Sequence, residues 1–97
     1  MQTIKLTPYD NRLNGAYKPE GEVVVLLDTA TGPFSVTLPD ASDSENTKFT
    51  FVVTGSNQAV IVPVTGQFIN DLKSVTISKD EIISVTAYQK KYYRVSN

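Results

Sequence analysis

The chain has 97 residues and a formal net charge of −1, with nine Lys and Arg against ten Asp and Glu, and it contains no His, Cys or Trp. This length suits one domain and is too short for two. The missing residue types exclude imidazole and thiolate catalysis, zinc fingers, the usual haem ligands and disulfide bonds. Without an excess of Lys and Arg, nucleic-acid binding is not expected as the main task.

Residue composition favours strands over helices. Val, Thr and Ile make up 29 of the 97 residues and Phe and Tyr add nine more, whereas Ala and Leu together number 11. β-Branched and aromatic side chains suit the pleated, half-buried surface of a sheet. The predicted fold class is therefore all-β: an antiparallel β-sandwich or small barrel of about seven or eight short strands.

The N-terminal residues differ from the rest of the chain. Gln2–Thr7 could form a short strand that ends at Pro8, and residues 9–21 are polar and rich in turn formers. We interpret residues 1–21 as an extended N-terminal arm that reaches over a neighbouring molecule, and residues 22–97 as the β-sandwich domain. A loosely held terminus is the alternative interpretation of the arm.

Strand signals recur along residues 22–97, with turn residues about every 8–12 positions. The expected strands are Glu22–Asp28, Phe34–Leu38, Lys48–Thr54, Ala59–Val64, Gln67–Ile69, Ser74–Ser78, Ile82–Tyr88 and Lys91–Val95.

No targeting or membrane segment is evident in the sequence. The first residues lack the apolar region of a secretory signal, and no stretch approaches the roughly 18 apolar residues that cross a bilayer. We therefore expect a protein that is made in a cytoplasm and has no membrane partner. The initial Met1 suggests a complete reading frame.

Several of the expected strands are apolar on both faces. A strand with one face in the core and the other in solvent should instead alternate apolar and polar residues. A domain of this size buries only about 60–65% of its unfolded surface and cannot easily cover both faces of several strands. We interpret the second-face residues as an oligomer interface, formed by Val24, Leu26, Val52 and Ile82. The alternative is that they belong to central strands packed under a loop.

Acidic residues offer weak candidates for chemistry. Asp40, Asp43 and Glu45 have a spacing that can hold Ca²⁺, but the loop lacks the glycine and distal Glu of an EF-hand, so we favour a solvated loop. Carboxylate pairs for glycoside hydrolysis could be chosen among several Asp residues, none of them distinctive, because all lie at strand ends or turns. We predict no catalytic residue, no metal and no cofactor. We also predict that the chain is not an enzyme. The Asp residues considered as pairs are Asp28, Asp40, Asp71 and Asp80.

Tyrosines alternate with cations in the C-terminal segment, a pattern that can stack on sugar rings or bases. The possible ligand face comprises Tyr88, Lys91, Tyr92 and Arg94. The alternative, which we favour, is that Tyr93 and Val95 close the core while the cations remain solvated.

One stretch, Thr31–Ala41 (TGPFSVTLPDA), resembles a segment of virion proteins of tailed bacteriophages, found in tail fibres, head fibres and small capsid-decorating domains. The resemblance continues through Lys48–Thr54 and the Gly55-Ser56-Asn57 turn to Tyr92 and Tyr93, covering roughly residues 28–95. The chain departs from the pattern at Asp71, where a glycine is usual, and in ending on tyrosines instead of Trp.

The resemblance implies a homotrimeric β-domain on the virion surface, made in the host cytoplasm. Its expected role is capsid decoration or a head-fibre base that binds the major capsid protein. A receptor- or glycan-binding module of a tail fibre is the alternative, and an accessory domain of an enzyme is a third hypothesis. The arm would then contact the capsid through Ile4, Leu6, Tyr9, Arg12 and Tyr17.

Overall fold

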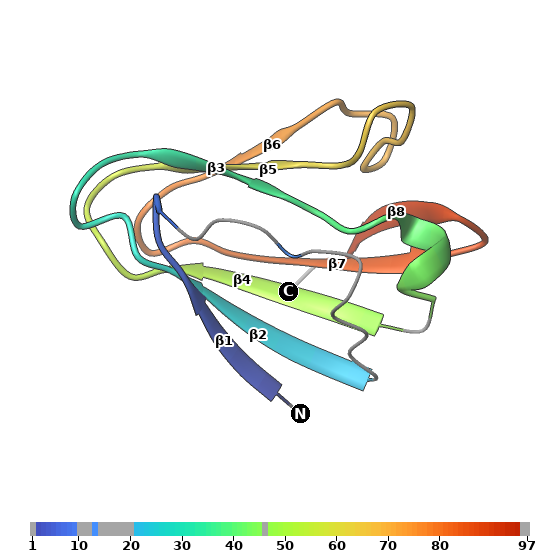
Figure 1. Ribbon diagram of the computed structural model, residues 1–97, viewed down its shortest axis with the longest axis horizontal. Helices are drawn as coiled ribbons and strands as arrows, with labels where there is room; N and C mark the ends of the chain where they lie inside the picture. Colours follow the sequence, from blue (N-terminus) through green and yellow to red (C-terminus); the bar gives the residue numbers. More distant parts are fainter. Residues whose placement is uncertain (1, 10–12, 14–20, 46, 96–97) are drawn as a thin grey trace.

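The computed structural model describes residues 2–9, 13, 21–45 and 47–95, and it places eight strands in two layers (Figure 1). The larger layer has the strand order β1-β2-β4-β7-β8 and the smaller one β3-β5-β6. A single turn of 3-10 helix, η1 (Ala41–Asp43), precedes β4. The prediction of an all-β sandwich is confirmed. The strands are β1 (Gln2–Leu6), β2 (Gly21–Leu27), β3 (Phe34–Thr37), β4 (Thr47–Val53), β5 (Ala59–Val62), β6 (Val75–Ile77), β7 (Ile82–Tyr88) and β8 (Lys91–Val95).

The sheets are mixed, whereas the sequence suggested antiparallel pairing throughout. The pairs β1–β2, β2–β4 and β3–β5 are parallel, and β4–β7, β5–β6 and β7–β8 are antiparallel. The reason is the path of the chain. After β2 it crosses to the other sheet to form β3 and returns to form β4 beside β2 in the same direction, so sheet neighbours are not sequence neighbours.

The core lies between the two layers and follows from strand alternation. Along β4 every second residue is buried, beginning with Thr47, and β2 alternates in the same phase from Val23 onward. The rings of Phe49 and Phe51 lie 6.3 Å apart between centroids and fill the middle of the larger sheet. The facing sheet contributes fully buried side chains from each of its strands, namely Val36, Ala59, Ile61 and Ile77.

Two loops lock together at one end of the sandwich, where the β2–β3 and β4–β5 connections lie side by side (Figure 1). The buried Thr29 hydroxyl donates to the Asn57 carbonyl at 2.9 Å and accepts from the Asn57 amide at 3.1 Å. The Asn57 side-chain amide donates to the Thr29 carbonyl at 2.6 Å. Gly55 sits against this pair of residues, and a Cβ there would lie 2.6 Å from backbone atoms of Thr29 and Ala30.

The described part of the predicted arm contributes an edge strand to the larger sheet. β1 pairs with β2 in parallel, from Gln2 opposite Val23 to Leu6 opposite Leu27. Leu6 and Leu13 are buried in the core, and Lys5 forms an ion pair with Asp28 at 3.3 Å between Nζ and Oδ2. Residues 2–6 and 13 thus pack with the sandwich, and most of the remaining arm lies outside the described residues.

Two tight turns each place two consecutive residues other than glycine at positive φ. Asn70 and Asp71 have φ of 48° and 69°, and Ile69 and Leu72 exchange both backbone hydrogen bonds across them, at 2.9 and 2.8 Å. This is the geometry of a two-residue hairpin turn in which glycine is favoured at the second position. Gln89 and Lys90 form the corresponding turn between β7 and β8, with φ of 51° and 66°.

The Asn70-Asp71 turn yields a stability prediction. Replacing Asp71 with glycine should raise the free energy of unfolding by about 0.5–1 kcal/mol, because glycine adopts positive φ without a Cβ penalty. Urea denaturation monitored by circular dichroism measures the change. Asp71→Ala is the control and should be less stable than the parent, and a glycine variant no more stable than the parent would contradict the assignment of strain to this turn.

Candidate functional site

The four residues predicted to form an oligomer interface lie together on the outer face of the larger sheet. Leu26, Val52 and Ile82 are register partners on the adjacent strands β2, β4 and β7, so they form one row across the sheet, hereafter the apolar row. Val24 lies on the same face of β2, two residues before Leu26. The sequence pattern therefore predicted residues that the fold brings together.

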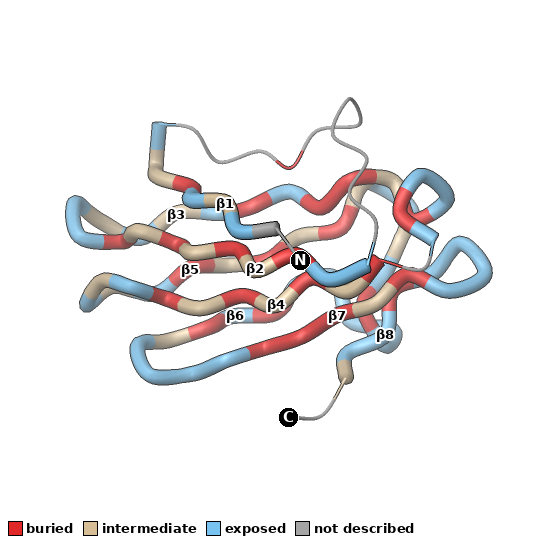
Figure 2. Tube along the Cα trace, turned by 90° about the horizontal axis from the view of Figure 1, so that it is seen from below, coloured by how far each residue is buried: buried red, intermediate tan, exposed pale blue. Residues whose placement is uncertain are grey.

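The apolar row is only partly covered. Val24, Leu26 and Val52 are half-buried, and Ile82 is 54% exposed. Figure 2, which views the molecule from below, shows intermediate and buried positions alternating along β2 and β4. A large aliphatic side chain left exposed forgoes roughly 1.5–3 kcal/mol of burial. Large exposed apolar patches on soluble proteins mark surfaces that bind other molecules.

Polar and charged groups lie beside the apolar row on the same face, together with Val24. The hydroxyls of Thr50 and Ser84 lie 3.0 Å apart, in the row next to the apolar row. One row further along, Glu22 is the register partner of Lys48, so opposite charges stand next to each other. At one end of the apolar row, Lys5 is the register partner of Leu26 and forms its ion pair with Asp28. The charges beside the apolar row are therefore paired, and a second copy presenting this face meets no net repulsion.

The predicted ligand face on the C-terminal hairpin is divided by the structure. Tyr88 is 55% exposed, and Lys91 and Arg94 are also exposed. Tyr92, however, is a core residue with 1% exposure, and its hydroxyl donates to the Pro39 carbonyl at 2.7 Å. Burial raises the pKa of Tyr92 to about 12.

The placement of Tyr92 and Tyr93 corrects the sequence interpretation in two ways. Tyr92 is not part of an exposed face, and Tyr93, expected to help close the core, is instead 40% exposed. The reason is the register of β8, in which Tyr92 pairs with the buried Ala87 and Tyr93 pairs with Thr86 on the outer face. Alternation along a strand places the two tyrosines on opposite faces of the sheet, but it does not determine which of these faces packs against the core.

The acidic side chains of the loop act on the local backbone. Asp40 accepts hydrogen bonds from the Ser42 hydroxyl at 2.7 Å, the Ser42 amide at 2.9 Å and the Gln67 side chain at 3.0 Å, and these bonds lower its pKa. The Glu45 carboxylate accepts from the amides of Gln89 and Lys90 at 3.2 and 2.8 Å, and so braces the strained β7–β8 turn. Asp43 is exposed.

The other carboxylates that were weighed as catalytic pairs also lie at loops and turns. Asp28 accepts from the Ala30 amide at 3.1 Å and pairs with Lys5, which together lower its pKa. Asp71 and Asp80 both adopt a φ of 69° in turns. Within residues 2–9, 13, 21–45 and 47–95, no three acidic side chains gather as metal ligands would.

Residues proposed for the capsid-contacting arm have different surroundings. Leu6 is buried, Ile4 is half-buried and packs against the core, and Tyr9 is 90% exposed. Arg12 and Tyr17 lie outside the described residues. Among the described residues of this set, Tyr9 therefore has the largest exposed fraction and is the most accessible to a partner.

The structure also reveals a groove that the sequence did not indicate. It lies between residues 66–71 and the β7–β8 hairpin, has a volume of about 660 Å³, and includes Phe68, Asn70, Lys90 and Tyr93 in its lining. Residues 67–69 were interpreted only as a short strand. The groove depends on the bridge between Ile69 and Tyr92, two residues far apart in the chain, and no sequence pattern connects them.

No helix in the described part of the chain is long and apolar enough to span a membrane. The chain matches no family model, no curated protein and no solved structure among known proteins.

Proposed function

We propose that this chain is a non-enzymatic structural protein of a tailed-phage virion, a homotrimer that decorates the capsid and binds the major capsid protein. The observation that carries the proposal is the apolar row, in which the aliphatic side chains of three adjacent strands lie on the outer face of the larger sheet, half-buried at Leu26 and Val52 and 54% exposed at Ile82. The virion assignment is supported by the resemblance of Thr31–Ala41 to segments of phage virion proteins.

The occupant of the apolar row is a further copy of the same chain. Two identical surfaces meet favourably only if their charges do not repel, and here Glu22 stands beside Lys48 on the same face. The whole chain has a net charge of −1, so long-range repulsion between copies is small. Apolar burial at Leu26, Val52 and Ile82 supplies the driving force.

Contact with the capsid would use a separate part of the molecule. β1 is an edge strand of the larger sheet, and an edge can accept a strand of another protein. The exposed Tyr9 follows β1 by three residues and adds aromatic surface beside that edge. Self-association through the apolar row leaves this edge available for the shell.

Light scattering after size-exclusion chromatography tests the trimer. The parent chain should elute with three times its 10.6 kDa mass, and Val52→Lys should elute as a monomer, because a lysine in the row places a charge in the interface. Val60→Lys is the matched control: Val60 is also a half-buried valine on a central strand, but of the smaller sheet, and this variant should remain trimeric.

Two results would overturn the assembly proposal. The first is a parent chain that is monomeric at micromolar concentration. The second is dissociation by Val60→Lys but not by Val52→Lys, with both variants shown to be folded by circular dichroism. Capsid binding has its own test: the trimer should bind saturably to phage heads that lack this protein, and failure to bind would remove the decoration role.

A further inference from the structure

The groove beside the β7–β8 hairpin is distinct from the apolar row, which lies across β2, β4 and β7. Its volume of about 660 Å³ falls within the roughly 300–1,000 Å³ of small-molecule sites. Its lining combines aromatic, cationic and carboxylate or amide side chains, so it differs in chemistry from the apolar row. Such a combination suits a ligand that has a ring to pack on the aromatic side chains and polar groups to bind the charged ones.

Strand alternation explains why these side chains face the same way. Ile69 forms a β-bridge to Tyr92, and both side chains are buried. Residues next to a buried strand position point to the opposite side. Phe68 on one segment and Tyr93 on the other therefore lie on the open side, with 43% and 40% of their surface exposed.

Hydrogen bonds from backbone amides to a carbonyl and to two side-chain oxygens hold the walls of the groove in place. The Asn70 amide donates to the Tyr92 carbonyl at 3.2 Å, and the Asn70 side-chain oxygen accepts from the Arg94 amide at 3.2 Å. On the other side, the Gln67 side-chain oxygen accepts from the Ala41 amide at 3.0 Å. A site whose walls are fixed before binding loses less entropy when it is occupied.

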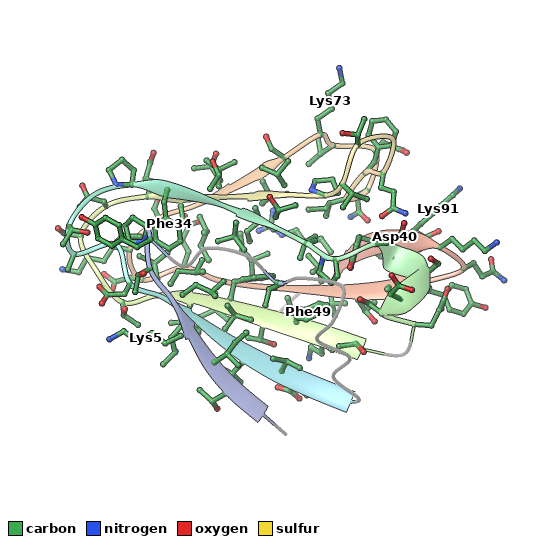
Figure 3. The ribbon with its side chains drawn as sticks, viewed as in Figure 1. Lys5, Phe34, Asp40, Phe49, Lys73 and Lys91 are labelled. Atoms are coloured by element: carbon green, nitrogen blue, oxygen red, sulfur yellow. The ribbon has the colours of Figure 1, made fainter. Side chains whose placement is uncertain are left out.

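The charges around the groove favour an anion of limited charge. Lys90 and Lys91 line it, and the single carboxylate in the lining is that of Asp71. Figure 3 shows Lys91 and Asp40 at the same end of the sandwich, with Lys73 extending from the neighbouring loop. The carboxylate of Asp71 and the overall charge of −1 disfavour a polyphosphate chain.

We propose that this groove binds an acidic oligosaccharide, a chain of sugars that carries carboxylate groups. The C–H face of a sugar ring packs on the electron-rich faces of Phe68 and Tyr93. The ammonium group of Lys91, with that of Lys90, binds the sugar carboxylate, and Asp71 accepts hydrogen bonds from hydroxyls. The groove residues all belong to one chain, and none of them is part of the apolar row.

Isothermal titration calorimetry of the full chain with hexagalacturonate tests the proposal, with neutral maltohexaose and a short oligothymidine as comparison ligands. We expect saturable binding of hexagalacturonate, no saturation by maltohexaose, and weaker binding of oligothymidine. Lys91→Gln should weaken binding at least about tenfold, the loss expected for one charge-assisted contact. Phe68→Ala should weaken it by a similar factor through the lost ring.

Matched controls lie just outside the groove. Lys73→Gln removes an exposed cation and Leu72→Ala removes an apolar side chain that is 51% exposed, and neither residue lines the groove. Both should change the affinity less than twofold. The proposal is overturned if hexagalacturonate does not saturate, if maltohexaose or oligothymidine binds as tightly, or if the controls weaken binding as much as Lys91→Gln. Light scattering of the groove variants keeps this result separate from the trimer proposal.

Discussion

Gly55→Ala should lower the free energy of unfolding by about 3 kcal/mol, the upper end of what overpacking a close-packed site usually costs. An added Cβ would lie 2.6 Å from the Ala30 amide nitrogen, the Thr29 carbonyl carbon and the Thr29 hydroxyl oxygen. Two of these are backbone atoms, so rotating a side chain cannot relieve the contact. Relief requires moving the loops apart.

Separating the loops also weakens the bonds that join them. Thr29 and Asn57 share three hydrogen bonds of 2.6–3.1 Å, and Thr29 is fully buried. A buried donor or acceptor left without its partner costs about 1–3 kcal/mol. The two connections hold β2–β3 and β4–β5 at one end of the sandwich, so the damage reaches both sheets.

Thermal and urea denaturation measure the effect, which for a domain of this size corresponds to roughly 4–8 °C of melting temperature per kcal/mol. Gly66→Ala is the control. Gly66 has a φ of 88° with nothing within 4 Å of an added Cβ, so that variant has only backbone strain and should lose about 1 kcal/mol. Equal losses at the two glycines would show that the contact with Thr29 and Ala30 is not what fixes Gly55.

The sequence predicted the fold class and most of the strands because both depend on local information. The expected strand Gln67–Ile69 is not among the strands of the described residues, where Ile69 forms only isolated bridges. The β-branched composition and the alternation of Phe49, Phe51 and Val53 with other residues predict a strand with one buried face, and the structure shows that alternation of burial along β4. The pairing of β2 with β4 in parallel was not predicted. It depends on which sheet each strand joins, and short apolar runs such as Val23–Leu27 carry no information about that.

The candidate sites likewise differ in whether they depend on local sequence or on strand pairing. Val24, Leu26, Val52 and Ile82 were identified because their surplus apolar character is visible in the alternation, and the register of three strands brings them onto one face. The groove could not be predicted in the same way. Its walls come from residues 66–71 and from β8, which meet through a single bridge between Ile69 and Tyr92.

Tyr92 illustrates why a residue type alone does not determine a role. In the sequence it is one of several tyrosines among cations, a pattern that suits a ligand face. In the fold its hydroxyl donates to the Pro39 carbonyl, 53 residues away in the chain, between β3 and η1. The tyrosine therefore ties the last strand to the start of the acidic loop, which its position among Lys91 and Arg94 does not reveal.

The burial of Tyr92 makes stability depend on pH in the alkaline range. A tyrosine has a pKa of about 10 when unfolded, and burial raises that of Tyr92 in the fold to about 12. The folded state therefore holds the phenol proton more tightly than the unfolded chain does. The resulting stability is fully present below pH 10 and is lost as the pH rises from about 10 to about 12.

The expected loss is about 2.7 kcal/mol, since each pKa unit corresponds to about 1.36 kcal/mol. Urea denaturation of the parent chain and of Tyr92→Phe across this pH range isolates the contribution, because all other titrating groups cancel in the difference between the two proteins. At neutral pH the phenylalanine variant should be less stable by about 1–2 kcal/mol, because the Pro39 carbonyl loses its donor. As the pH rises past 10 that difference should shrink and then change sign, since phenylalanine has no proton to lose. A difference in unfolding free energy that stays constant to pH 12 would contradict the prediction. It would show that the pKa of Tyr92 is the same in the folded and unfolded chain, so that burial does not raise it.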